Sequence, residues 1–131
     1  GICDRKNPVA VALLQEIKRN LQWIIWIIEG TAPEALEALP VPTHAFIGGS
    51  AGNLKEILEL LLRKNPNIRV VLNTVTVETL AEAASCFKKL AFEEPEIVCL
   101  QASNAKKAGR SHLMIAQNPV YIFTAQGGAK E

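Results

Sequence analysis

Hydrophobic positions along the chain switch repeatedly between a helical and an extended spacing. The clearest helical stretch follows Asn53, where apolar residues recur every three or four positions and charged residues fill the other face. Two further long helices are predicted after Pro8 and after Thr76, and a short one begins at Thr31. The apolar positions assigned to the three longer helices are Val9, Leu13, Ile17 and Leu21; Leu54, Ile57, Leu58, Leu61 and Leu62; and Val77, Leu80, Ala84 and Phe87.

Runs of β-branched and aromatic residues between these helices predict short strands. They cover residues 23–28, 44–47, 68–75, 97–100 and 120–123, and Ile2 and Cys3 read as the end of another strand. Strands that alternate with helices are typical of an α/β fold with a mostly parallel sheet. We expect the last two strands to form an antiparallel pair, with a polar, basic stretch at residues 104–110 between them.

The length and composition fit a single domain. The chain has 131 residues, of which 49% are hydrophobic and 21% charged, and its formal net charge is +1. This balance gives no overall attraction to nucleic acid or to an anionic membrane. We assign residues 1–125 to the domain and residues 126–131 to a flexible polar tail.

Several classes of protein are excluded by what the chain lacks. No segment approaches the roughly 20 apolar residues that a membrane-spanning helix needs, and the first residues do not resemble a secretory signal. Cys3, Cys86 and Cys99 are too scattered for a disulfide framework, and His44 and His112 have no metal-ligand spacing. We therefore expect a cytoplasmic protein that holds no metal ion.

Ligands of open parallel sheets bind beyond the carboxyl ends of the strands. An acid after the first strand suits the ribose of a nucleotide, because a carboxylate accepts hydrogen bonds from both hydroxyl groups of a diol. An acid near a helix start is also a common helix cap, so this alternative stays open. The residues at the predicted strand ends are Asp4; Gly30, Thr31 and Ala32; Gly48, Gly49 and Ser50; and Asn73.

The glycine-rich turn at residues 48–53 precedes the clearest helix. Such a turn brings backbone N–H groups and the positive end of the helix dipole close to an anion, although a tight strand-to-helix connection explains it equally well. It lacks the Lys–Ser/Thr ending of a Walker loop. The turn also matches the G-x-S-x-G pattern of a nucleophile elbow at Ser50, with His112 downstream. A hydrolase is therefore an alternative, disfavoured because so short a pattern matches often.

Five segments in order along the chain resemble one known family. They are residues 4–8 (DRKNP), 29–34 (EGTAPE), 46–53 (FIGGSAGN), 72–80 (LNTVTVETL) and 118–122 (NPVYI). Together they resemble the decarboxylating precorrin methyltransferases of cobalamin biosynthesis, which include the stand-alone C15-methylase and the carboxyl-terminal half of the fused C5,15-methylase. The Ile47–Gly48–Gly49–Ser50 turn is the most specific of these elements.

The resemblance implies a class I, Rossmann-like methyltransferase fold that uses S-adenosylmethionine. It implies methylation of a precorrin at C15 together with loss of carbon dioxide from a ring acetate. The implied cofactor-binding residues are Asp4, Gly30, Thr31 and Ala32, with Asp4 on the ribose. The implied substrate-binding residues are Gly48, Gly49, Ser50 and Asn53 at the turn, and Lys106 and Arg110 as partners for carboxylates.

In this family a first strand and a Gly-rich loop precede the acid, whereas here Asp4 is the fourth residue. That strand would lie between the strands that end at Asp4 and at Ile47. We expect this chain to be the carboxyl-terminal part of a longer protein, to bind S-adenosylmethionine weakly, and to form a homo-oligomer through open sheet edges. An RNA methyltransferase of the same fold, disfavoured by the even charge balance, and a non-catalytic self-associating module stay open.

Overall fold

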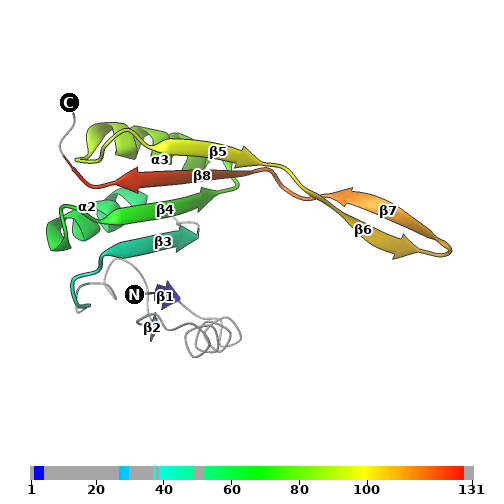
Figure 1. Cartoon of the computed structure of the whole chain (residues 1–131), viewed down its shortest axis with the longest axis horizontal. Coiled ribbons are helices and arrows are strands. Elements are labelled where there is room, and N and C mark those ends of the chain that lie inside the picture. Colours follow the sequence, from blue (N-terminus) through cyan, green and yellow to red (C-terminus); the bar gives the residue numbers. More distant parts are fainter. Residues whose placement is uncertain (1, 5–26, 30–36, 38, 49–51, 129–131) are drawn as a thin grey trace.

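The computed structural model describes residues 2–4, 27–29, 37, 39–48 and 52–128, and their strands form three sheets (Figure 1). A four-stranded sheet has the order β3–β4–β8–β5, while β1 pairs with β2 and β6 pairs with β7. The strand bounds are β1 Ile2–Asp4, β2 Ile27–Glu29, β3 His44–Gly48, β4 Arg69–Thr74, β5 Glu96–Leu100, β6 Ser103–Ala108, β7 Ser111–Ala116 and β8 Val120–Gln126.

The four-stranded sheet mixes parallel and antiparallel pairs. β3 and β4 are parallel and are connected through α2 (Leu54–Lys64), while α3 (Val77–Lys89) follows β4 and precedes β5. β8 lies between β4 and β5 and runs antiparallel to both. From β3 to β5 the predicted alternation of strands and helices is confirmed, as is the predicted antiparallel pairing of the strands at residues 97–100 and 120–123. The short helix predicted at Thr31 begins outside the described residues.

Local hydrogen bonds fix the ends of both helices. At the start of α3, the Thr76 side chain accepts a hydrogen bond from the Thr79 N–H at 3.1 Å, as expected of a threonine N-cap. At the end of α2, the Lys64 ammonium donates to the Leu39 carbonyl at 2.8 Å. The Asn65 side-chain amide donates to the Pro42 carbonyl at 2.9 Å. These bonds hold the end of α2 against the segment that leads into β3.

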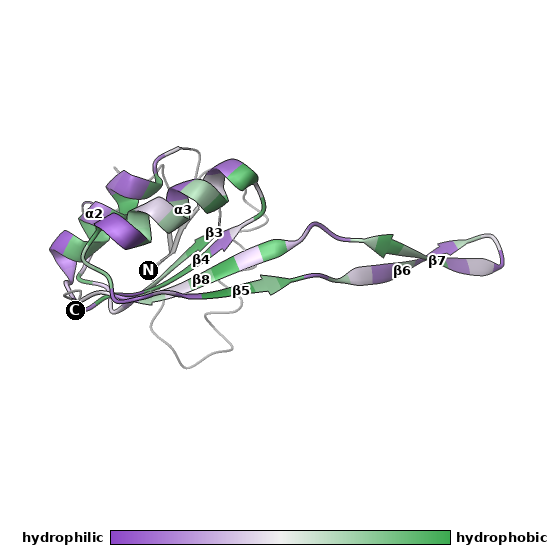
Figure 2. Ribbon diagram, turned by 90° about the horizontal axis from the view of Figure 1, so that it is seen from above, coloured by the Kyte–Doolittle hydropathy of each residue, from purple (hydrophilic) through white to green (hydrophobic). Residues whose placement is uncertain are grey.

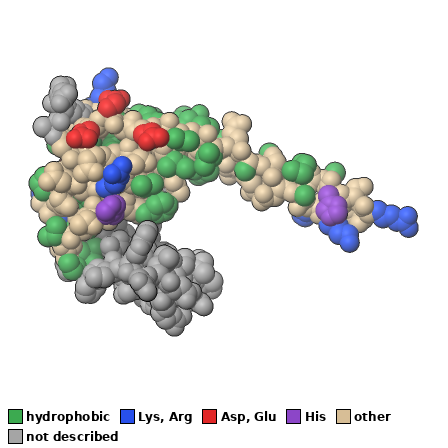
Figure 3. Space-filling model, viewed as in Figure 1, with side chains coloured by type: hydrophobic (Ala, Val, Ile, Leu, Met, Phe, Trp, Pro, Cys, Tyr) green, Lys and Arg blue, Asp and Glu red, His purple; other side chains and the backbone are tan. Residues whose placement is uncertain are grey.

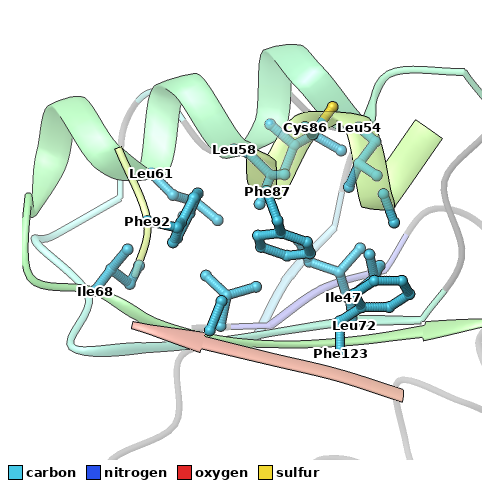
Figure 4. Packing of buried hydrophobic residues seen from close by; sticks show 14 of the residues in the cluster. Ile47, Leu54, Leu58, Leu61, Ile68, Leu72, Cys86, Phe87, Phe92 and Phe123 are labelled. Carbon is cyan, nitrogen blue, oxygen red and sulfur yellow. The ribbon is translucent and has the colours of Figure 1, made fainter. Parts of the chain in front are cut away.

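Both helices cover the same face of the sheet (Figure 2), and the hydrophobic core lies between them and the strands. In this layer the Phe87 ring contacts two other aromatic rings (Figure 4). Its centroid lies 5.1 Å from the centroid of Phe92 in an edge-to-face arrangement and 5.6 Å from the centroid of Phe123 in a stacked one. The largest fully buried side chains are Phe87, Phe92, Phe123, Leu54, Leu58, Ile68, Leu72, Val70 and Thr74. This layer holds β3 and β4 in the positions that define the candidate site.

The buried faces of the helices differ in part from the predicted ones. In α3, Val77 and Ala84 are exposed, and the buried residues are Ala83, Cys86 and Phe87. The core-facing stripe is therefore rotated around the helix relative to the prediction. In α2 the stripe is wider than predicted, because Leu60 is also buried in a helix that contacts α3.

A hairpin of β6 and β7 projects beyond the end of the four-stranded sheet (Figure 1). We call residues 103–116 the arm and the four-stranded sheet with α2 and α3 the body. The turn of the arm contains Gly109 at a φ of +63°, a conformation that glycine adopts without steric cost. The sequence reading placed only a polar stretch here, so these two strands were missed.

The end of β8 and the two residues after it are paired with other segments of the chain. Gln126 is the last residue of β8, the Gly127 N–H donates to the Ile68 carbonyl at 2.7 Å, and the Gly128 N–H donates to the Ala91 carbonyl at 2.9 Å. The predicted tail thus begins with residues that form backbone hydrogen bonds to the body, and residues 129–131 lie outside the described residues. The predicted helix after Pro8 lies outside the described residues. Within the described ranges, neither helix has the length and apolar character needed to cross a membrane.

Candidate functional site

Two parallel strands end side by side at the carboxyl edge of the sheet. β3 ends at Gly48, which lies opposite Asn73 in the register of β3 and β4. Because the strands are parallel, the segments that follow them leave from the same edge, where open α/β sheets bind their ligands. The structure thus brings together two of the predicted strand ends, with Gly48 exposed and Asn73 half-buried.

The segment after β3 leads to the amino terminus of α2. Gly52 has a φ of +81°, a backbone conformation that residues other than glycine adopt only with strain. Asn53 occupies the N-cap position of α2. The Asn53 carbonyl accepts the N–H of Ile57 at 3.0 Å, which begins the helical ladder. The N–H groups of the first turn favour an anion such as a carboxylate, although Glu56 in the same turn already supplies one negative charge.

A buried hydroxyl group lies at the same end of β4. Thr74 is 2% exposed, and its Oγ1 has no hydrogen-bond partner. Leaving such a group unpaired in the interior costs about 1–3 kcal/mol, so an orphaned hydroxyl at a strand end requires an explanation. Sequence reasoning did not single out Thr74, because threonine is common in strands and nothing in the sequence reports an unpaired hydroxyl.

The predicted cofactor acid ends a strand. β1 and β2 are parallel, and Asp4 lies opposite Glu29, so two carboxylate residues occupy the carboxyl ends of neighbouring strands. In Figure 1 the arrows of β1 and β3 point the same way. Carboxylates are acceptors that fit the ribose diol of S-adenosylmethionine, so the residues present here fit that cofactor.

The predicted basic partners lie elsewhere. Lys106 belongs to β6 and Arg110 to the turn of the arm, and both are exposed. Lys106 is six residues beyond the end of β5 at Leu100, a span of about 20 Å for extended chain. Figure 3 shows the basic side chains of the arm gathered toward its far end. The structure therefore does not bring Lys106 and Arg110 together with Gly48 and Asn53 within one chain.

The remaining predicted site residues lie outside the described residues. These are Gly30, Thr31 and Ala32 of the cofactor set, and Gly49 and Ser50 of the substrate set. His112, the partner required by the hydrolase alternative, lies on the arm opposite Lys107, so that alternative gains nothing from the structure. Among the described side chains, no group of three or more His, Cys, Asp or Glu residues could hold a metal ion.

Residues 8–127 match the family of the precorrin methyltransferase domain. The chain belongs to this family. It is 33% identical over 121 residues to the probable cobalt-precorrin-6B C(15)-methyltransferase (decarboxylating) of Methanothermobacter thermautotrophicus, an alignment that covers 90% of this chain and 62% of the relative. The chain thus spans about three-fifths of the length of that relative.

Solved structures give the same relationship. The precorrin-6Y C5,15-methyltransferase of Geobacter metallireducens superposes with a TM-score of 0.74 at 31% identity, over 95% of this chain and 66% of that one. The precorrin-8W decarboxylase of Methanobacterium thermoautotrophicum has a TM-score of 0.73 at 32% identity, over 95% and 67%. The predicted resemblance and the predicted Rossmann-like methyltransferase fold are confirmed.

Proposed function

We propose that this chain forms part of an S-adenosylmethionine-dependent methyltransferase that methylates a precorrin at C15 and releases carbon dioxide from a ring acetate, in the cytoplasm, as a step of cobalamin biosynthesis. One observation carries the proposal. In a chain that matches the precorrin methyltransferase family over residues 8–127, Gly48, Asn73 and the start of α2 lie at one sheet edge.

The proposed chemistry needs positioning more than it needs a reactive side chain. Bound S-adenosylmethionine would supply a methyl group on a sulfonium, which is already a good leaving group, so no side chain would have to act as a nucleophile. Orientation alone supplies roughly 7–11 kcal/mol in well-aligned reactions. In this proposal Asp4 accepts hydrogen bonds from the ribose of the bound cofactor, and the amino terminus of α2 receives a substrate carboxylate.

The proposal also retains the predicted homo-oligomer and the two predicted sets of binding residues, one for the cofactor and one for the substrate. Asp4, Gly30, Thr31 and Ala32 stay the proposed cofactor residues, and Gly48, Gly49, Ser50 and Asn53 stay the proposed substrate residues. Lys106 and Arg110 stay in the substrate set only if a second copy brings them to the sheet edge. The chain spans 62% of the length of the relative described above, and the complete reaction is proposed for the whole protein.

The test is methyl transfer from methyl-labelled S-adenosylmethionine to cobalt-precorrin-6B, with release of carbon dioxide, by the protein at its natural length. The Asn53→Asp variant places a second negative charge at the start of α2 while keeping a good N-cap residue. We expect its KM for the precorrin to rise roughly tenfold, equivalent to about 1.4 kcal/mol, with its affinity for S-adenosylmethionine unchanged.

Asn67→Asp is the matched control, because Asn67 is exposed beyond the opposite end of α2. We expect its KM to stay within about twofold of the parent value. Equal effects of the two variants would contradict the role given to the start of α2. Absence of transfer to the precorrin would favour the non-catalytic module, and transfer to RNA instead would favour the RNA methyltransferase.

A further inference from the structure

Asn73 places an amide in the middle of the four-stranded sheet. It is the next-to-last residue of β4, which lies between β3 and β8. Asparagine is depleted in strands, so an amide at a central position requires an explanation. Leu72 and Thr74 are buried on the side of the helices, and successive side chains of a strand point to opposite faces. Asn73 therefore lies on the face that α2 and α3 do not cover (Figure 2).

The Asn73 side chain has a hydrogen-bonding capacity that the described part of the chain does not use. It is half-buried and forms no side-chain hydrogen bond with another described residue. A carboxamide carries two N–H donors and one acceptor oxygen. Asn73 lies opposite Gly48 at the carboxyl end of β4, where open α/β sheets bind their ligands. The amide is therefore available to a ligand at this edge.

The surroundings of this amide are uncharged. Across the sheet, Asn73 lies in one row with Gly48 of β3, Ile122 of β8 and Val98 of β5. None of the four residues is charged, and Gly48 leaves the position beside the amide without a side chain. A Cβ added at Gly48 would lie 3.5 Å from the Cε1 atom of Phe46, so an aromatic ring borders this position. The row thus offers a ligand one amide among apolar groups.

The start of α2 offers a carboxylate the opposite environment. The free N–H groups of its first turn and the positive end of the helix dipole stabilise an ionised carboxylate. A neutral amide among apolar groups stabilises the ionised form less, because charge-assisted contacts are stronger and burial of a charge is costly. The carboxyl edge of the sheet therefore has one place suited to a carboxylate that keeps its charge and one suited to a carboxylate that loses it.

Loss of carbon dioxide from a ring acetate requires the second environment. The bond between the acetate methylene and its carboxylate carbon breaks, carbon dioxide leaves, and the electron pair passes through the conjugated ring to an imine nitrogen. The methylene carbon then takes a proton from water and becomes a methyl group, while the imine is restored. Contacts that hold the charge on the carboxylate in the ground state oppose this step, whereas removal of the carboxylate from water favours it.

We propose that Asn73 binds the acetate carboxylate that the reaction removes. Its amide donates an N–H to one carboxylate oxygen beside the open position at Gly48, with the apolar side chains of Phe46 and Ile122 next to it. One neutral hydrogen bond orients the acetate without fixing its charge. This role rests on the proposed function, and it assigns the decarboxylation step of that function to one residue.

The experiment measures two products separately with the protein at its natural length. Cobalt-precorrin-6B labelled in the acetate carboxylate reports carbon dioxide, and methyl-labelled S-adenosylmethionine reports methyl transfer. Asn73→Leu removes the hydrogen bond at similar volume, so we expect the KM for the precorrin to rise about tenfold, with the ratio of carbon dioxide to transferred methyl unchanged. Asn73→Lys supplies a cation, so we expect a KM no higher than the parent value and a ratio that falls several-fold.

Asn67→Leu and Asn67→Lys are the matched controls, because Asn67 is exposed just before the other end of β4. Both should stay within about twofold of the parent in KM and in ratio. Thermal unfolding followed by circular dichroism checks that every variant is folded.

The two Asn73 variants separate a contact with the acetate from a purely structural role, which would lower both products together at an unchanged ratio and KM. That result, or a ratio unchanged in Asn73→Lys, would overturn the role of Asn73 while methyl transfer by the parent protein still supported the proposed function. A parent protein that transfers no methyl group to the precorrin would contradict the proposed function itself, and the role of Asn73 would fall with it.

Discussion

β4 and β7 carry similar apolar runs but lie in opposite environments. β4 contains Val70, Val71 and Leu72, lies between two strands, and buries Val70 and Leu72 under the helices. β7 contains an equally apolar run in which every residue is exposed. An apolar run in a strand therefore predicts that something covers it, but not whether the cover comes from the same chain. For β4 the cover is α2 and α3, whereas no described residue of the chain buries β7.

The largest expected contrast between the two regions is in the free energy of unfolding. Phe123→Ala removes a fully buried ring that contacts Phe87, and we expect it to destabilise the chain by about 3–5 kcal/mol. Leu113→Ala removes a side chain that is 55% exposed on the arm, and we expect a change within about 0.5 kcal/mol for the monomer.

Urea unfolding at low protein concentration measures both values, because dilution removes any contribution from association. Comparable losses in the two variants at low concentration would show that the arm packs against its own body.

The body could be predicted from the sequence because its signals are local. The helical spacing after Asn53 and the cap at Thr76 each involve residues within one or two turns of helix. The sequence of the helix itself is therefore enough to predict it. The position of β8 between β4 and β5 depends on long-range pairing. Sequence order predicted its antiparallel partner in β5 but gave no information about its contact with β4.

The arm was missed for a physical reason. β6 consists of Ser, Asn, Ala, Lys, Lys and Ala, residues with little intrinsic preference for strands, so its extended form depends on pairing with β7. The apolar run at residues 113–115 was a usable signal, and Gly109 marked the turn. The same hairpin carries Lys106 away from Asn53. Composition alone does not predict this separation.

A smaller effect is expected at Thr74, whose hydroxyl is the one buried side-chain group without a hydrogen-bond partner in the described part of the chain. Thr74→Val keeps the shape of the side chain and removes Oγ1, so we expect the free energy of unfolding to rise by about 1 kcal/mol. Thr124→Val in β8 is the control, because Thr124 is only half-buried. We expect no gain there.

Enzyme assays of the same variant show whether the hydroxyl at the sheet edge is retained for function. If Thr74→Val is more stable but binds the precorrin or the cofactor less tightly, the hydroxyl serves the site at a cost in stability. A loss of stability in Thr74→Val would show instead that Oγ1 finds a partner in the folded protein.

The smallest expected effect is a dependence of the unfolding free energy on pH that arises at Cys86. Cys99 is exposed in β5, whereas Cys86 is buried in α3, where burial and, to a lesser extent, the nearby Glu82 carboxylate raise the pKa of its thiol above the usual 9.0. The folded chain therefore keeps this proton at a pH where the unfolded chain has lost it. Its contribution to stability is complete below about pH 9 and is lost as the pH rises through the raised pKa.

Urea unfolding from pH 7 to pH 10 of the parent chain and of Cys86→Ala isolates this contribution, because the other titrating groups are common to both. We expect the difference in unfolding free energy between the two chains to be constant below about pH 9 and to shrink above it. A difference for Cys86→Ala that grows with rising pH would mean that the thiolate is stabilised in the fold, and would contradict the assignment of the Cys86 thiol to the buried core beneath α3.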